Sequence, residues 1–147
     1  MIDRKYIGHS YPPLVVDVEK GQLTFFAKAT GEMNPVYTDV SAAQAAGYRE
    51  LPAPPTFAFS LNLVKPDPFA QYIEMGIDLG KVLHAEQSFE YLEPICAGDT
   101  ITLQDKVTDI FEKKGGALEF LVTETTATNQ HGASVVKMVS TTVVRNG

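Results

Sequence analysis

The sequence has little of several features that mark whole classes of protein. Its single cysteine, Cys96, rules out a disulfide within the chain, and the lack of disulfides is typical of a reducing compartment. No run of residues approaches the roughly 20 apolar positions that a membrane helix needs, and no basic segment followed by an apolar run marks a secretory signal. We therefore expect a cytoplasmic protein without a membrane span.

Positive charge and metal ligands are also scarce. The chain carries 12 Lys and Arg against 18 Asp and Glu, a net charge of −6, which argues against nucleic acid or an anionic membrane as the main partner. The three histidines, His9, His84 and His131, show no metal-ligand spacing, and there is no glycine-rich phosphate loop. The sequence therefore predicts no metal and no resident cofactor.

What the sequence does have is the material for one α+β domain spanning residues 1–147. A length of 147 residues with 44% hydrophobic residues is enough to bury a core. A short strand is expected at 14–16, and helices at about 19–30, 41–46 and 54–64. Prolines open the last helix and end it, and its 57–64 segment is apolar nearly all round, which predicts burial on every side.

The second half of the chain has the pattern of strands. Alternating or β-rich runs occur at 84–91, 101–111, 118–128 and 135–144, and the last three are joined by turns at 113–116 and 129–132. These three runs predict an antiparallel meander. The connector at 69–82 has no clear pattern.

One stretch, residues 25–39, concentrates polar side chains in a stiff loop between two helices. Gly31 suits the left-handed position just past a helix end, and Asn34-Pro35 forces the chain to extend. Asp39 can cap the next helix. Glu32, Asn34 and Tyr37 are thus held in a plausible place for chemistry, although a solvated turn is the simpler interpretation.

This stretch resembles the signature of the MaoC-like, or R-specific enoyl-thioester hydratase, family of hot-dog-fold proteins. In that signature an aromatic and small residues precede Gly, Asp, any residue, Asn, Pro, a hydrophobic residue, His, any residue and Asp. The chain matches it at Gly31, Asn34, Pro35, Val36 and Asp39. Residues 45–49 and 52–57 also resemble the N-terminal-type dehydratase domains of the family, and the resemblance extends over nearly the whole chain.

The resemblance implies a hot-dog fold, in which an antiparallel sheet wraps a long central apolar helix and pairs with a second subunit in a dimer. It also implies a reaction that adds water to a trans-2-enoyl thioester or removes it from a (3R)-3-hydroxyacyl thioester. A carboxylate and an imidazole act there as general acid and base, and backbone N–H groups stabilise the enolate oxygen. The thioester would be carried by coenzyme A or acyl carrier protein.

The chain departs from the family at the positions that carry this chemistry. Glu32 stands in the place of the family Asp, and Tyr37, with a phenol pKa near 10, stands in the place of the His. The family's Ala-His-Gly turn, whose glycine supplies an N–H donor, reads Ala53-Pro54-Pro55 here, and proline has no N–H to donate. All three departures predict a chain that is a poor hydratase by itself.

Three functions follow from this resemblance. In the first, the chain is the non-catalytic, acyl-chain-binding half of a heterodimeric dehydratase whose partner carries Asp and His. In the second, it is a self-sufficient homodimeric enoyl-CoA hydratase that uses Glu32 and Tyr37. In the third, it is a thioester-binding protein without turnover. The resemblance implies a set of substrate-binding residues: Asn34, Pro35, Pro55, Thr56, Phe57 and Phe59.

The residues near this set have simpler interpretations as well. Phe57 and Phe59 either line an acyl channel or fill the core. Arg49 either meets a phosphate or pairs with the neighbouring Glu50, and His84 opens a strand in which a structural role is expected.

Overall fold

The computed structural model describes residues 1–147 and contains one five-stranded antiparallel sheet. Its strands are β1 Leu14–Asp17, β2 Val82–Tyr91, β3 Thr100–Lys113, β4 Leu118–Thr128 and β5 Ser134–Arg145. They are ordered β1-β3-β4-β5-β2. The predicted meander is β3-β4-β5, while β2 pairs with the outer side of β5 and β1 with the outer side of β3.

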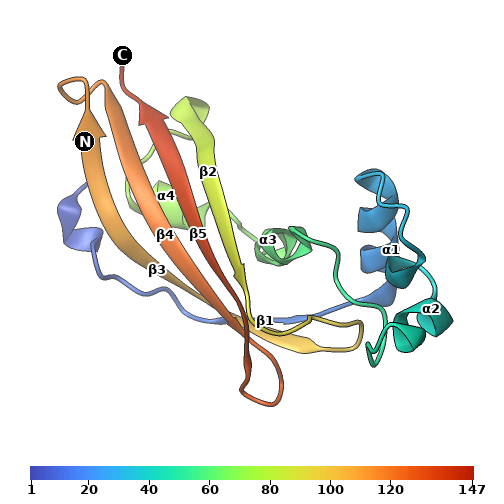
Figure 1. Cartoon of the computed structure of the whole chain (residues 1–147). Helices are drawn as coiled ribbons and strands as arrows, with labels where there is room; N and C mark the ends of the chain where they lie inside the picture. Colours follow the sequence, from blue (N-terminus) through green and yellow to red (C-terminus); the bar gives the residue numbers. More distant parts are fainter.

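The helices are short. They are α1 Lys20–Ala29, α2 Val40–Ala45, α3 Phe57–Ser60 and α4 Ala70–Glu74, with 3₁₀ turns η1 Arg4–Tyr6, η2 Pro35–Tyr37, η3 Leu61–Val64 and η4 Leu79–Lys81. No helix has the length and apolar character needed to cross a membrane. Figure 1 shows α1 and α2 as a lobe at one end of the molecule, with α3 between this lobe and the sheet. The α+β prediction is confirmed.

The central helix differs from its prediction in three respects. It begins at Phe57 and not at residue 54, and only its first four residues are α-helical, while residues 61–64 form a 3₁₀ turn. Phe57 and Leu61 are 3% and 1% exposed, whereas Leu63 and Val64 are 55% and 47% exposed. The expectation of burial on every side is therefore wrong for the outer face, because the sheet covers one face of the helix and the chain has no second layer for the other.

The interior consists of two hydrophobic clusters on the same sheet. The first, of 16 buried residues, joins α1, α3 and one end of the strands and includes Leu23, Phe57, Leu61, Leu103 and Met138. The second, of 8 buried residues, joins the N-terminal segment, the Met75–Ile77 region and the other end of the strands; it includes Ile2, Tyr11, Met75, Val107 and Leu121. Between them lies a row of polar side chains on the same face of the sheet.

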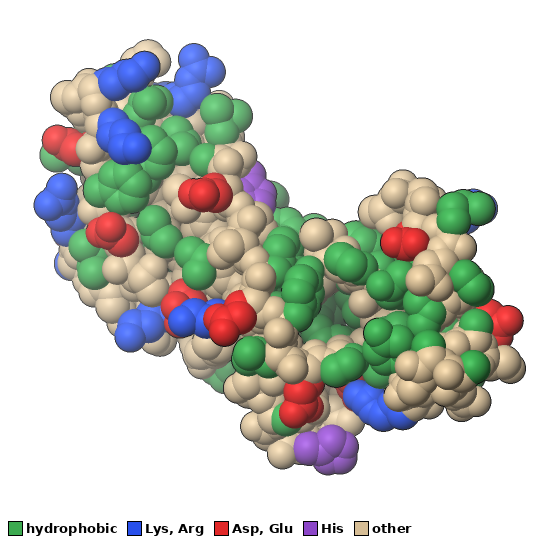
Figure 2. Space-filling model, in the orientation of Figure 1, with side chains coloured by type: hydrophobic (Ala, Val, Ile, Leu, Met, Phe, Trp, Pro, Cys, Tyr) green, Lys and Arg blue, Asp and Glu red, His purple; other side chains and the backbone are tan.

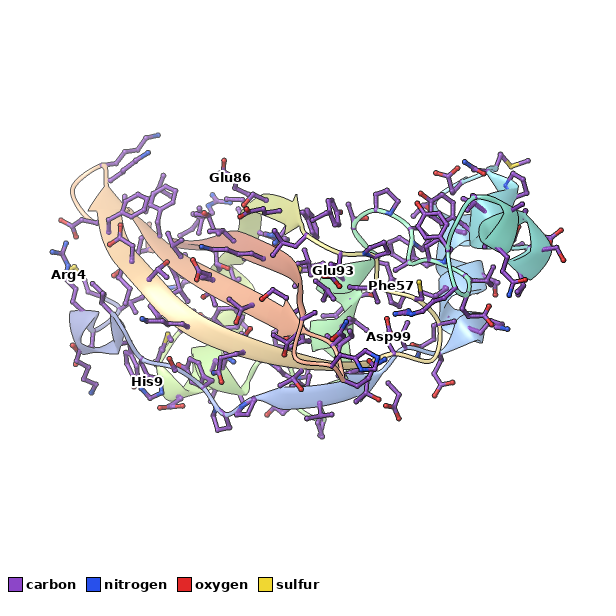
Figure 3. All side chains as sticks on the ribbon, turned by 60° about the horizontal axis from the view of Figure 1, so that its bottom comes forward. Arg4, His9, Phe57, Glu86, Glu93 and Asp99 are labelled. Atoms are coloured by element: carbon purple, nitrogen blue, oxygen red, sulfur yellow. The ribbon has the colours of Figure 1, made fainter.

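A buried ionic network attaches the helical lobe to the sheet. Asp99 is 2% exposed, and its carboxylate accepts hydrogen bonds from Arg49, from the Cys96 backbone N–H at 2.8 Å and from Gln130 Nε2 at 3.0 Å. Asp99 lies where the end of the sheet meets the α1–α2 lobe (Figure 3). The alternative pairing of Arg49 with Glu50 is wrong, because Glu50 bonds Lys20 at 3.0 Å, and the Arg49 guanidinium is committed to a buried carboxylate.

Candidate functional site

The loop between α1 and α2 is held by its own polar groups. Gly31 has a φ of +73°, and the following N–H, of Glu32, donates to the Ala27 carbonyl at 2.9 Å, so the helix ends as predicted. Asn34 Oδ1 accepts the Val36 N–H at 3.1 Å, and Asp39 caps α2 by accepting from the Ser41 N–H at 2.8 Å. Asn34, a predicted substrate contact, thus already caps the η2 turn that begins at Pro35.

Glu32 turns back on this loop. Its Oε1 accepts the Asn34 backbone N–H at 3.0 Å, and the side chain lies in a shallow groove beside Lys28 and Met33. No hydrogen bond joins it to Tyr37, although its charge is close enough to act on the phenol. The carboxylate is therefore placed as a loop-stabilising acceptor.

Tyr37 points into a different space. It is half-buried and lines a cavity of about 220 Å³ together with three further side chains that carry polar groups, Tyr48, Tyr91 and Glu93. Burial, and then the negative charge of Glu32 and the neighbouring phenols, raise the pKa of Tyr37 above its ordinary value of 10. The phenol therefore remains protonated at neutral pH and is not a base there.

The backbone N–H at the start of α3 is already hydrogen-bonded within the protein. Pro55 has no N–H, and the next donor, the Thr56 backbone N–H, bonds the Tyr91 hydroxyl at 2.8 Å. Thr56 has a φ of +71°, a left-handed conformation that a β-branched residue rarely adopts. The structure thus holds this N–H against a side chain of the same protein.

The two predicted channel aromatics face different spaces. Phe57 is buried and packs edge-on against Phe26, with ring centroids 5.4 Å apart, at the base of an apolar groove of about 410 Å³ between α1 and α3. Phe59 stacks on His84 with centroids 5.2 Å apart and lines a polar cavity against the sheet. Four of the predicted site residues thus line four different spaces: Glu32, Tyr37, Phe57 and Phe59.

Three residues of the Tyr37 cavity, Tyr48, Tyr91 and Glu93, were not singled out in the sequence. Tyr48 follows the glycine after α2, Tyr91 is the last residue of β2, and Glu93 lies two residues beyond it. Positions at the ends of helices and strands often carry functional groups. This is the one sequence signal that could have identified these three residues. Figure 3 places Glu93 and Phe57 in the region between the sheet and the α1–α2 lobe. No group of three or more His, Cys, Asp or Glu side chains is arranged to hold a metal ion.

The family described as "FAS1-like, dehydratase domain region" matches residues 5–138. The chain belongs to this family. A UPF0336 protein of Streptomyces avermitilis is 38% identical to this dehydratase-family chain over 110 residues, which cover 74% of the chain and 73% of the relative. A UPF0336 protein of Saccharopolyspora erythraea is 34% identical over 145 residues, which cover 98% of the chain and 92% of the relative.

Solved structures agree with the family. The dehydratase-family chain is similar to a C-terminally truncated HadBC (3R-hydroxyacyl-ACP dehydratase) complex from Mycobacterium tuberculosis, with a TM-score of 0.78 and 26% identity over 94% of this chain and 96% of that one. It is also similar to a MaoC-like dehydratase, with a TM-score of 0.83 and 25% identity over 95% of this chain and 42% of that one. The predicted MaoC-like family and the hot-dog fold are confirmed.

Proposed function

We propose that the chain is the non-catalytic, acyl-chain-binding subunit of a two-chain (3R)-3-hydroxyacyl-thioester dehydratase, which in the reverse direction hydrates trans-2-enoyl thioesters. A MaoC-like partner with the family Asp and His supplies the chemistry. The observation that carries the proposal is Tyr37. This residue occupies the position of the family base, but it is a phenol whose pKa is raised further above neutral pH.

The surroundings of Tyr37 support the same division of roles. A general base works best with a pKa near the working pH, and a phenol titrating above 10 is far from it. Glu32 is bonded within its loop, and the Thr56 N–H is bonded to Tyr91. A donor aimed at a developing oxyanion typically contributes 100-fold or more to the rate, so a chain without a free donor and a base is a poor catalyst.

A second subunit fits the free edge of the sheet. β2 is bonded on one side to β5, and its outer edge has no partner strand. Leu83, Tyr91 and Leu92, in and just after this strand, are 52%, 55% and 51% exposed. Figure 2 shows the surface hollowed between the sheet and the α1–α2 lobe, with hydrophobic side chains along the hollow. An unpaired edge with exposed apolar residues is what a partner strand covers, and the similar HadBC is itself a complex.

In this proposal the acyl chain lies in the apolar groove between α1 and α3. Its walls are formed by apolar side chains on both helices, with Phe25 72% exposed at the rim and Phe57 buried at the base. An extended aliphatic chain that covers this surface gains about 25 cal/mol for each Å² removed from water. This groove gives the chain a role in selecting acyl length without any part in the chemistry.

The test is hydration of a short and a long trans-2-enoyl-CoA by the purified chain, by a co-expressed MaoC-like partner, and by both together. We expect turnover only when the partner is present, and a long-chain rate that rises when this chain is added. Val64→Phe should narrow the groove and reduce the long-chain rate but not the short-chain rate. Val15→Phe, at an exposed position of β1 outside the groove, is the matched control.

The proximity of Glu32 to Tyr37 favours one competing function, a homodimeric hydratase that uses Glu32 as base and Tyr37 as proton donor. Robust turnover by the chain alone, lost in Glu32→Ala and in Tyr37→Phe, would establish that function and overturn the accessory role. Binding of thioester without turnover under every condition would instead leave a thioester-binding protein.

A further inference from the structure

A row of polar side chains crosses the inner face of the sheet between the two hydrophobic clusters. On β3 the inward positions run Ile101, Leu103, Asp105 and Val107, so one carboxylate interrupts an apolar series. Asp105 lies opposite Thr125 of β4. In the adjacent row, Gln87 of β2 lies opposite Ser140 of β5, which lies opposite Thr123 of β4. We call these five residues, Asp105, Thr125, Gln87, Ser140 and Thr123, the polar belt.

The charge in the belt is fully compensated. Lys65 Nζ lies 2.7 Å from Asp105 Oδ2, Gln71 Nε2 donates to the same oxygen at 3.2 Å, and Thr125 Oγ1 donates to Oδ1 at 2.6 Å. Both carboxylate oxygens therefore have partners, and the ion pair leaves no net charge. A ligand beside it is best accommodated as a neutral group.

Two buried acceptors beside this ion pair have no donor. They are Asn62 Oδ1 and Gln87 Oε1. The amide nitrogen of Gln87 donates to the Ser88 carbonyl at 3.3 Å, which fixes the orientation of this amide. A buried acceptor without a donor destabilises the folded state, because it has lost its hydrogen bond to water. Apolar residues would avoid that cost, so the two oxygens are unfavourable for folding alone.

Both residues line one cavity of about 130 Å³. Its floor is the belt, and its roof is the connector from Phe59 to Tyr72, which lies over the sheet. The exposed side chains at its rim, Leu63 and Phe69, are apolar and are 55% and 48% exposed. The cavity thus combines an apolar rim with a polar floor, and it shares no residue with the Tyr37 cavity.

We propose that this cavity binds the end of a neutral, otherwise apolar molecule that carries hydroxyl or amide N–H donors. The donors bond the carbonyl oxygens of Asn62 and Gln87, and the apolar part lies against Phe59, Leu63 and Phe69. An ammonium or carboxylate end would meet no net countercharge, because Lys65 and Asp105 already neutralise each other. A carboxylate would in addition face the two carbonyl oxygens. A purely aliphatic end would leave both acceptors without donors.

This binding site stands independently of the proposed dehydratase role. Where that role holds, the ligand class becomes an acyl chain with a hydroxyl or amide group remote from the thioester; that extension rests on the proposed function. Binding of simple probes to the free chain tests the site without any turnover, so its failure is distinguishable from failure of the dehydratase proposal.

The test compares isomers of the same composition, of which one carries a hydrogen-bond donor and the other does not. The full-length chain is titrated with n-hexanol against methyl pentyl ether, and with hexanamide against N,N-dimethylbutanamide, and binding is followed by NMR of the backbone amides. One hydrogen bond is worth about 0.5–1.5 kcal/mol, so each donor-bearing probe should bind about 2- to 12-fold more tightly than its isomer. The resonances that shift should be those of the polar belt and of residues 59–72.

Variants assign the preference to the two acceptors. Asn62→Leu and Gln87→Leu should each reduce the ratio between isomers toward one, while Gln44→Leu, on the exposed surface of α2, should leave it unchanged. Equal binding of the isomers to the unmodified chain, no shift near the belt, or a preference that survives both substitutions would each overturn the proposal. The first two outcomes need no variant and hold even where a substitution prevents folding.

Discussion

The hydroxyl of Tyr91, at the end of β2, accepts the backbone N–H of Thr56, which opens α3, at 2.8 Å. This bond joins the edge strand to the start of the helix and holds Thr56 at a φ of +71°. The N–H that follows Pro55 is thereby engaged by the protein itself. The geometry of the helix entrance is thus set by contacts within the chain, at a cost in backbone strain.

Relief of that strain is measurable. A non-glycine residue in the left-handed conformation costs about 1–2 kcal/mol, whereas glycine adds a smaller entropic cost, so Thr56→Gly should raise the free energy of unfolding by about 0.5–1 kcal/mol. Thr38→Gly, at an exposed loop position with a φ of −132°, should lower it by about as much. Urea unfolding of both variants checks the pair. An equal loss of stability in the two would show that Thr56 is unstrained.

Tyr11 provides a test at alkaline pH. Burial, and then the charge of Glu74 with smaller effects of Tyr6 and Asp105, raise the pKa of Tyr11 to about 12. The unfolded chain ionises near pH 10, so this contribution to stability is complete below pH 10 and is lost as the pH rises from about 10 to 12. Tyr11→Phe should therefore reduce the fall in unfolding free energy measured across that window.

The same substitution is informative at neutral pH. The Tyr11 hydroxyl is buried without a hydrogen-bond partner, so Tyr11→Phe should leave stability unchanged or raise it by about 1 kcal/mol. Tyr6→Phe is the control, because the Tyr6 hydroxyl donates to the Glu74 carbonyl at 3.1 Å and its removal should cost about 0.5–1.5 kcal/mol. A loss in Tyr11→Phe as large as that in Tyr6→Phe would contradict the assignment.

The ionic network at Asp99 should dominate the stability of the helical lobe. Arg49→Ala leaves the nearly buried Asp99 carboxylate with neutral donors only. We expect the free energy of unfolding to fall by about 2 kcal/mol. This is less than for a fully buried ion pair, because the Arg49 side chain is 48% exposed. Adding Asp99→Asn should recover part of the loss. Lys20→Ala, which breaks the more exposed Lys20–Glu50 pair, should change stability by less than about 0.5 kcal/mol. Similar losses in the two single variants would refute this ranking.

The accessory role makes a kinetic prediction for the loop. In the complex with a catalytic partner, Glu32→Gln and Tyr37→Phe should change the hydration rate by less than about 3-fold, because neither group takes part in proton transfer. A working general acid or base contributes about 10²–10⁴-fold. Steady-state rates of the complex decide between these values, and replacement of the partner's catalytic His is the positive control. A loss of 100-fold in either variant would place the chemistry in this chain.

Much of the fold was predictable because its signals are local. The end of α1 at Gly31, the Asp39 cap and the hairpins of the β3-β4-β5 meander are each determined by residues a few positions apart, and all agree with the sequence-based expectation. The family position of Tyr37 was equally visible, because it lies within one short motif.

Long-range features were not predictable from local pattern. The Arg49–Asp99 contact joins residues 50 positions apart, and Tyr91 meets Thr56 across 35 positions. α4 gave no signal, because the 69–82 connector is too short and irregular to show a period. Asp105 is visible in the sequence as one charge among the alternating apolar residues of β3. Its ion pair with Lys65 is not, because Lys65 lies in another part of the chain.

The polar belt also divides the apolar interior of the protein into two parts. Because the belt separates the two hydrophobic clusters, the apolar contacts around Tyr11 and Met75 are not continuous with those around Leu23 and Leu61. We therefore expect the segments that pack on the sheet to unfold separately on the two sides of the belt. We expect the N-terminal segment and α4 to exchange their amide hydrogens in one event, and α1 and α3 in another, slower one. A molecule held in the belt cavity would touch both units and merge the two events into one.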